Sequence, residues 1–340
     1  MKILMTGDPQ EGYTCKFREV LETFADVTVS NSEFFHQTNE FDFVFINWPE
    51  ELLFWQLPTK EGIKKVSTAL DFWKSKSKIV VTMHNEQPHF KQFGREMTDL
   101  VYSSADIMLH LGRKSIETHR RNYQAKDIPH VVIPHVLFDY ESHLSKAEAR
   151  EKLGLSPNDS VVLVFGNMRH HDEVKFVNSV FRKLRLPNKN LVYSRYKYRG
   201  PRLVKGLQRS IHRFQKHIIR HETRCPDEMV QNYFLSADVV LIPRLDTLNS
   251  GIISVAAQFK RIVVGADTGN IGEVLREIKC PVFLPYDVDG AVFAVNEAFK
   301  LSQTALPEEI YNHAQKFWSN SSISEILKLE LSKALPSSPK

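Results

Sequence analysis

The sequence predicts an α/β protein made of two units, each a parallel sheet with helices on both faces. Three observations support this fold class. Short apolar runs typical of buried strands alternate with helix-like segments along all 340 residues. That length favours about two domains. A new strand-and-turn opening, Val161–Asn167, restarts the pattern near the middle of the chain. Such alternation is typical of parallel sheets with right-handed crossovers.

In the first half, the stretch Met1–Gly7 is too short to be a signal peptide. It is expected to contain the first strand instead. Helical patterns are predicted at Phe17–Phe24 and Ile63–Lys74. The predicted strands are Lys2–Met5, Asp26–Val29, Phe43–Ile46, Lys78–Thr82, Ile107–His110 and His130–Ile133.

The boundary between the units is expected between Pro134 and Val161, where Phe138–Arg150 is polar and helix-prone and turn residues follow. The tail, residues 307–331, is predicted to form one or two helices. The predicted strands of the second half are Val161–Phe165, Asn190–Tyr193, His217–Arg220, Val239–Ile242, Arg261–Gly265 and Val282–Leu284.

Composition excludes several classes of protein. No apolar run approaches the roughly 20 residues of a membrane-spanning helix. Cys15, Cys225 and Cys280 are isolated, which argues against a disulfide framework or a zinc site and favours a reducing cytoplasm. The net charge of +5 is mild, so its distribution matters more than its sum.

The segment Ala237–Ala257 has the pattern of an anion site. An apolar strand is followed by a small polar turn, Asn249-Ser250-Gly251, and then by a helix-forming stretch from Ile252. Free N–H groups and the positive end of a helix dipole meet at such a turn. The pattern therefore predicts a phosphate-bearing ligand at the carboxyl edge of a parallel sheet, although Asn and Ser are also common helix caps.

Several motifs, in order along residues 1–300, resemble the family 4-like glycosyltransferases of GT-B fold. They are Ile46-Asn-Trp-Pro-Glu, Val81-Thr-Met-His-Asn-Glu-Gln-Pro-His, Val132-Ile-Pro-His, Ala149-Arg-Glu-Lys-Leu-Gly-Leu, Ala237-Asp-Val-Val-Leu-Ile-Pro, Leu248-Asn-Ser-Gly, and the stretch from Lys260 to Val274. The resemblance implies two Rossmann-like domains with parallel sheets facing across a cleft. Residues 1–140 would form the acceptor domain, with helix 319–335 packing back on it, and residues 141–318 the nucleotide-sugar donor domain.

The chain departs from that family in its donor loop. The family has two glutamates eight positions apart, where this chain has Asp246 and Ser254. It has only Gly7 and Gly12 where a Gly-rich loop usually follows the first strand. Donor identity and the stereochemistry of transfer are therefore left open.

For the donor we predict contacts with the diphosphate from Asn249, Ser250 and Gly251. An arginine after the first strand of the second unit, Arg169, would neutralise the leaving diphosphate. Lys175, Arg244 and Glu273 are further candidate contacts of the donor. For each of them the alternative is an ordinary role on the protein surface or at a helix end.

For the acceptor, the resemblance places His84 beside the transferred sugar, as a hydrogen-bond partner or a base. Glu86 and His89 follow in the same loop, and Glu50 and Glu51 follow Trp48-Pro49 as candidate ligands of acceptor hydroxyls. No metal is expected, because the neighbouring His170 and His171 point in different directions and GT-B enzymes generally bind none.

A basic amphipathic helix is predicted from Arg202, Lys205, Arg209 and Arg213, with Lys216 and Arg220 continuing the spacing. Its apolar stripe of Val204, Leu207, Ile211 and Phe214 is expected either to face the core or to serve a surface that attracts anionic lipid or a lipid-linked acceptor. Nucleic acid is not expected, since no recognised binding motif accompanies the charge.

Together these features predict a hexosyltransferase that moves a sugar from a nucleotide-diphosphate donor to a glycan or lipid-linked glycan, in polysaccharide or glycoconjugate synthesis. It would have no bound cofactor and would lie in the cytoplasm, in part on the inner face of the membrane. A nucleotide-sugar epimerase, a phosphorylase or a non-catalytic GT-B subunit are the alternatives.

Overall fold

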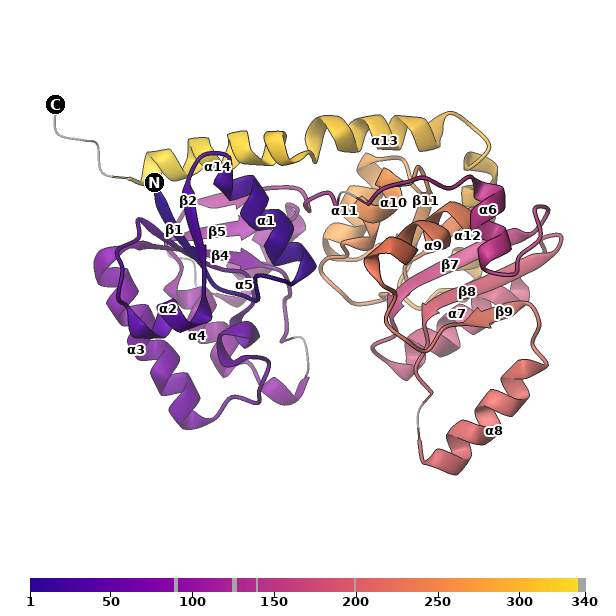
Figure 1. Cartoon of the computed structure of the whole chain (residues 1–340), viewed down its shortest axis with the longest axis horizontal. Helices are drawn as coiled ribbons and strands as arrows, with labels where there is room; N and C mark the ends of the chain where they lie inside the picture. The colour runs from indigo at the N-terminus through magenta and orange to yellow at the C-terminus, as the bar shows by residue number, and fades with distance from the viewer. Residues whose placement is uncertain (89–90, 124–126, 139, 199, 336–340) are drawn as a thin grey trace. The chain divides into compact units, whose positions relative to one another are not determined.

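The computed structural model describes residues 1–88, 91–123, 127–138, 140–198 and 200–335. The chain divides into two compact units, and Figure 1 shows a separate sheet in each of them. Unit 1 comprises Met1–Leu137 and the C-terminal segment from Lys316, and unit 2 comprises Phe138–Gln315. Each unit is described by itself below.

Unit 1 is a six-stranded parallel sheet in the order β2-β1-β3-β4-β5-β6. Two of its inner strands, β3 and β5, are buried along their whole length, as expected for a sheet covered on both faces. The strands are β1 (Lys2–Met5), β2 (Asp26–Val29), β3 (Phe43–Ile46), β4 (Lys78–Met83), β5 (Ile107–His110) and β6 (His130–Val132).

The helices of unit 1 cover both faces of this sheet (Figure 1). They are α1 (Gly12–Glu22), α2 (Asn31–His36), α3 (Lys60–Lys76), α4 (Glu96–Ser104), α5 (Lys114–Asn122) and α14 (Asn320–Ala334), with short 3-10 turns η1 (Pro49–Leu53) and η2 (Lys91–Phe93). The C-terminal α14 packs on α1, where the Thr23 and Ser324 hydroxyls are 2.5 Å apart. Its Ile323, Leu327 and Leu331 lie in the hydrophobic core of unit 1.

Unit 2 is a second six-stranded parallel sheet in the order β12-β11-β10-β7-β8-β9. Its strands are β7 (Ser160–Asn167), β8 (Lys189–Arg195), β9 (Ile218–Arg220), β10 (Val239–Leu241), β11 (Ile262–Ala266) and β12 (Val282–Phe283). Its helices are α6 (Lys146–Lys152), α7 (His171–Lys183), α8 (Arg202–Arg213), α9 (Val230–Ser236), α10 (Ile252–Gln258), α11 (Gly269–Glu277) and α12 (Val288–Leu301), with η3 (Asp227–Met229) before α9. Helix α13 (Leu306–Phe317) runs from unit 2 into the last segment of unit 1.

All twelve predicted strands are present, which confirms the α/β class. Two expectations about helices are corrected, and one of the two alternatives for the apolar stripe of α8 is excluded. The stretch after Phe138 becomes helical only at Lys146, where Ser145 and Glu148 form a capping box. Helix α8 ends at Arg213, so Lys216 lies beyond it and Arg220 lies in β9. The apolar side chains of α8 face solvent rather than a core.

Each sheet has one point where the strand order reverses. In unit 1, β1 lies between β2 and β3, and in unit 2, β7 lies between β8 and β10. In open parallel sheets generally, the loops that leave the two strands at such a point diverge to opposite faces of the sheet at its carboxyl edge. Ligands of open parallel sheets bind at this position.

Candidate functional site

The reversal point of unit 2 brings two arginines together around one carboxylate. Arg169 follows β7, and Arg244 follows β10, the neighbouring strand. Arg244 is 7% exposed and donates to Glu173 Oε1 at 2.6 Å and to the Asn167 carbonyl at 2.6 Å. A buried arginine with these two partners is fixed in place. Two loops from neighbouring strands are thereby joined at the carboxyl edge of the sheet.

The second carboxylate oxygen of Glu173 binds the loop that carries Arg169. This oxygen, Oε2, accepts from the backbone N–H groups of Arg169, at 2.6 Å, and of His170, at 3.1 Å. Burial and, to a smaller extent, the neighbouring Arg244 lower the pKa of the Arg169 guanidinium to about 10, although the charges of Glu173 and Asp246 act in the opposite direction. Arg169 is still charged at neutral pH, but it stands beside a second cation. An anion bound here would relieve that repulsion.

The Asn249-Ser250-Gly251 turn follows β10 at the same edge. Gly251 is the N-cap of α10, so neither Asn249 nor Ser250 takes the capping position that their residue types favour. Asn249 Oδ1 accepts from Asn270 Nδ2 at 2.7 Å. Helix α10 has only seven residues, which makes its dipole a small contribution. The backbone N–H groups of the turn are therefore the stronger argument for an anion here.

The backbone around Gly269, in the loop after β11, packs directly against Leu248, just before this turn; we call this contact the clasp. Gly269 has φ +49°, and a Cβ added there would lie 2.8 Å from both the Cα and the carbonyl oxygen of Leu248. The Asn270 N–H donates to that same carbonyl at 2.8 Å. The two loops thus touch backbone to backbone, which only glycine permits.

The remaining predicted donor contacts are placed as follows. Lys175 lies on α7, is largely exposed and pairs with Asp172 at 3.6 Å. Glu273 is half-buried in the second turn of α11, not in the first turn. At the two positions of the family's glutamates, Asp246 is exposed, whereas Ser254 is buried and donates to the Gly251 carbonyl at 2.9 Å.

The reversal point of unit 1 gathers carboxylates instead of guanidinium groups. Glu51, in η1 after β3, is 3% exposed and accepts from the Asp8 N–H at 2.9 Å through Oε1. Asn31 ties the same loops together, since it donates to the Glu51 carbonyl at 3.1 Å and accepts from the Gly7 N–H at 3.0 Å. Gly7, with φ +141°, leaves room for these contacts.

The second carboxylate oxygen of Glu51, Oε2, is buried and has no hydrogen-bond partner within the described parts of the chain. A Cβ added to Gly7 would lie 3.2 Å from Glu51 Oε2 and 3.1 Å from Thr14 Oγ1, which is equally unpartnered there. Burial, with Glu11, Asp8 and Glu50 nearby, raises the pKa of Glu51 to about 7 against the effect of its one N–H bond. This carboxyl is therefore poised between its neutral and charged forms near neutral pH.

His84 lies at the same edge, directly after β4. It is buried, stacks on Trp48 with ring centroids 4.5 Å apart, and meets Tyr13 edge-on at 4.6 Å. The Tyr13 ring also contacts His135, at 5.1 Å. The Tyr13 hydroxyl is buried without a partner in the described chain. Aromatic faces and buried polar atoms thus line one edge, a combination typical of small-molecule sites.

The other predicted acceptor residues divide into three cases. Glu50 is buried in η1 beside Glu51. Glu86 is turned toward α5, where it accepts from Asn122 Nδ2 at 3.1 Å and pairs with Arg121 at 3.4 Å. His89 lies outside the described residues. The sequence signalled Glu51 only as one of two adjacent glutamates. Tyr13 and Thr14, on α1, carried no signal, because their role depends on how α1 meets η1.

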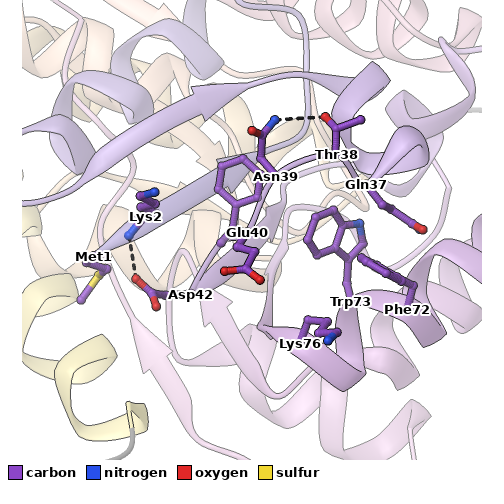
Figure 2. Close-up of a pocket in the computed structure, with 11 residues that line it drawn as sticks. Met1, Lys2, Gln37, Thr38, Asn39, Glu40, Asp42, Phe72, Trp73 and Lys76 are labelled. Carbon is purple, nitrogen blue, oxygen red and sulfur yellow. Dashed lines mark hydrogen bonds between the residues drawn. The ribbon is translucent and has the colours of Figure 1, made fainter. Parts of the chain in front are cut away.

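A large cavity of unit 1 lies away from these residues. It has a volume of about 820 Å³ and is lined by residues such as Lys2, Asp42 and Trp73. Figure 2 shows the Lys2 N–H donating to Asp42, at 2.7 Å, on the wall of this cavity. Lys2 begins β1, so the cavity opens at the amino edge of the sheet, opposite the edge where ligands of such sheets bind.

Within the described residues, no group of three or more His, Cys, Asp or Glu side chains has an arrangement suited to a metal ion. His171 is the first residue of α7, and His170 is its N-cap. Among the same residues, no helix combines the length and the apolar character needed to cross a bilayer.

Comparison with known proteins gives a match at the level of structure only. No family model matches the chain, and no curated protein does. Sucrose-phosphate synthase from Thermosynechococcus elongatus superposes with a TM-score of 0.72 at 12% identity, over 98% of this chain and 99% of that chain. A glycosyltransferase from Rickettsia africae gives 0.70 at 15% identity, over 99% of each chain. HepE of Anabaena, in complex with UDP-glucose, gives 0.68 at 15% identity, over 98% and 100%.

These similarities confirm the predicted GT-B fold, with two parallel Rossmann-like sheets. Identities of this size carry no residue-level assignment. The chemistry must therefore be argued from the two reversal points described above.

Proposed function

We propose that this chain is a glycosyltransferase that moves a sugar from a nucleotide-diphosphate donor to a hydroxyl group of a glycan. Unit 2 would hold the donor and unit 1 the acceptor. The observation that carries the proposal is the contrast between the two reversal points. One presents the Arg169 and Arg244 pair, and the other presents the Glu51 carboxyl among further acidic groups.

The donor side follows from charge. A nucleotide diphosphate brings about two negative charges to the edge where Arg169 and Arg244 stand together. Arg244 forms a buried ion pair with Glu173. Arg169 adds a second positive charge beside this pair, and we expect its guanidinium to contact the diphosphate. The N–H groups of the Asn249–Gly251 turn, on the neighbouring loop, supply further donors. Lys175 and Glu273 stay predicted donor contacts.

The acceptor side follows from the opposite charge. The acidic groups around Glu51 repel a phosphate and favour a neutral acceptor rich in hydroxyls. Glu51 Oε2 and Thr14 Oγ1 would hydrogen-bond one acceptor hydroxyl, and the stacked Trp48 and His84 would border the sugar ring. Glu50 and Glu86 stay predicted acceptor contacts. His84 would donate or accept a hydrogen bond with the sugar, while Glu51 would act as the base.

The reaction needs two changes of bond. The bond between the sugar's anomeric carbon and the diphosphate oxygen breaks, and its electron pair leaves with the diphosphate beside Arg169. The acceptor oxygen then bonds to the anomeric carbon and loses its proton to a base. Ionised Glu51, with a pKa of about 7, is suited to take that proton at neutral pH.

Donors of the structural neighbours support the choice of probe. HepE has been crystallised with UDP and with UDP-glucose, and a trehalose-6-phosphate synthase structure from Escherichia coli holds UDP-2-fluoroglucose. UDP-glucose is therefore the first donor to test here, followed by a panel of other nucleotide sugars.

Isothermal titration calorimetry of UDP-glucose, UDP, ADP and GDP tests the donor site. Loss of a charge-assisted hydrogen bond costs about 1.5–3 kcal/mol, so Arg169→Ala should weaken binding roughly 10- to 100-fold. Arg185→Ala is the matched control, because Arg185 is an exposed arginine just after α7. If no nucleotide diphosphate or nucleotide sugar binds to the wild-type chain, the proposal is wrong.

A non-catalytic GT-B subunit is the second candidate, favoured by one observation. Ser254 replaces a family glutamate and is bound to its own helix turn, so it offers no carboxylate to a ribose or sugar. Such a subunit would bind the nucleotide but show no turnover with a panel of donors and acceptors. Product analysis after incubation with donor and acceptor separates the two functions.

A further inference from the structure

One continuous segment of the chain carries an extreme charge. Residues 174–221 contain no aspartate or glutamate. The basic residues in it are Lys175, Arg182, Lys183, Arg185, Lys189, Arg195, Lys197, Arg199, Arg202, Lys205, Arg209, Arg213, Lys216 and Arg220. Their charge far exceeds the net +5 of the whole chain, so the rest of the molecule is net acidic. The segment forms most of α7 with β8, α8 and β9, and β9 is an edge strand.

Helix α8 in this segment exposes its apolar stripe. Successive positions of the stripe recur at helical spacing, which places them on one face. Their exposed fractions are 88% for Leu203, 43% for Val204, 63% for Leu207, 53% for Ile211 and 87% for Phe214. Figure 1 shows α8 extending away from the rest of unit 2, beyond β9.

The polar face of α8 is the one that holds it to unit 2. His212 Nδ1 lies 3.1 Å from the Tyr198 hydroxyl, and Arg209 lies over the Tyr198 ring at 5.1 Å. Arg209 also forms a two-bonded pair with Glu222, at 2.9 and 2.5 Å. A helix anchored through polar contacts, with its apolar face in water, is the reverse of ordinary core packing. Exposed stripes of this kind mark interaction surfaces.

The charge around the stripe selects the partner. Pairing of two copies through α8 would bring two strongly basic edges together. Nucleic acid would match the charge but gives no reason for five exposed apolar side chains. A bilayer with anionic lipids satisfies both features, because acyl chains receive the apolar face while phosphates attract the basic side chains.

A basic cavity beside α8 adds to this surface. It has a volume of about 480 Å³, and Lys175, Ser179 and Arg182 of α7 line it together with His212 and Arg220. Among the residues that the structure describes, none that lines this cavity is acidic. Its size and donors suit a phosphate-bearing headgroup.

We propose that α8 is a membrane-docking helix. Its stripe of Leu203, Val204, Leu207, Ile211 and Phe214 enters the interface of an anionic bilayer. Exposed basic side chains around α8, such as Lys197, Arg202 and Lys216, contact the lipid phosphates. This role goes beyond the proposed sugar transfer and does not depend on it.

Co-sedimentation with vesicles tests the proposal. The wild-type chain is expected to bind vesicles of phosphatidylcholine with 30% phosphatidylglycerol at low salt, and to bind pure phosphatidylcholine at least tenfold less. Raising the NaCl concentration should weaken binding. The double substitution Leu207→Glu with Phe214→Glu should reduce the bound fraction at least tenfold.

The matched control is Leu284→Glu with Phe293→Glu. These side chains are 67% and 68% exposed in the same unit, and Leu284 follows β12 at the opposite edge of the sheet. The control adds the same charge and should leave vesicle binding unchanged. Both variants should keep the wild-type melting temperature, because the substituted side chains are exposed.

Four results would overturn membrane docking. They are absence of binding to anionic vesicles, equal binding by the wild type and the stripe variant, and equal loss of binding in the control variant. The fourth is evidence that the stripe serves another partner. Such evidence would be self-association in sedimentation velocity that the stripe variant loses, or binding of a duplex oligonucleotide without binding of vesicles.

Discussion

At the scale of single residues, the two buried glutamates at the reversal points, Glu173 and Glu51, differ in how far their negative charge is compensated. Glu173 is matched by Arg244 and two backbone N–H groups, so its negative charge is compensated. Glu51 has one N–H donor and three acidic neighbours, which is why its pKa is raised to about 7. Residue type alone did not separate a carboxylate whose charge is compensated from one whose pKa is raised. Their surroundings do.

The raised pKa of Glu51 sets a pH dependence of stability. The folded chain holds this proton up to about pH 7, whereas the unfolded chain loses it near the ordinary value of 4.5. This carboxyl therefore stabilises the fold least above pH 7. Glu51→Gln should raise the melting temperature at pH 8 and change it little at pH 5, as differential scanning fluorimetry can show.

The same variant separates stability from catalysis. If Glu51 is the base, kcat of the wild type rises with a midpoint near pH 7, and Glu51→Gln lowers kcat by about 100-fold or more at pH 8. Thr68→Ala, at an exposed hydroxyl on α3, serves as a neutral control. A variant that is more stable at pH 8 but equally active would remove Glu51 from the reaction.

At the scale of elements, amphipathic pattern predicted α8 but not the direction of its faces. The spacing of apolar and basic residues is a local property and was visible in the sequence. Burial of either face depends on what lies across from it, and in unit 2 this is Tyr198 and Glu222 rather than an apolar layer. The alternative of a core-facing stripe was therefore wrong.

A second element-scale feature is the clasp between the loops after β10 and β11. Gly269→Ala adds a methyl group 2.8 Å from the Leu248 backbone at a positive φ. We expect lower stability and weaker UDP-glucose binding, because the Asn249–Gly251 turn must shift. Gly154→Ala is the control, since Gly154 also has a positive φ, +69°, with nothing within 4 Å.

Backbone strain alone costs roughly 1–2 kcal/mol, so Gly154→Ala should lower stability by about that amount and leave binding intact. Urea denaturation and calorimetry measure the two effects. Equal losses of stability in both variants, with unchanged nucleotide affinity, would contradict the clasp.

At the scale of the whole molecule, unit 1 is completed by a segment far away in sequence, whereas unit 2 is one continuous stretch of chain. Helix α14 supplies Ile323, Leu327 and Leu331 to the core of unit 1, more than 180 residues after β6. Leu327→Ala should therefore destabilise unit 1 by about 2–5 kcal/mol. Leu329→Ala, at a 58% exposed side chain on the same helix, should cost far less.

Hydrogen exchange measured by mass spectrometry can assign this loss to a unit. Faster exchange in β1 and β3, with unchanged exchange in β7 and β10, is the expected outcome for Leu327→Ala. Equal acceleration in the strands of both units would show that they unfold together.

The strands were predictable because a buried parallel strand is a short apolar run bounded by turn residues, and both features are local. So were the loops that carry Arg169 and the Asn249–Gly251 turn, since each follows such a run. The order of strands was not local, and it alone decided which loops meet at a reversal point. Arg244 against Glu173, the pKa of Glu51, the aromatic contacts of His84 and the outward face of α8 all depend on groups distant in sequence, because burial and electrostatic interactions are set by neighbours in space.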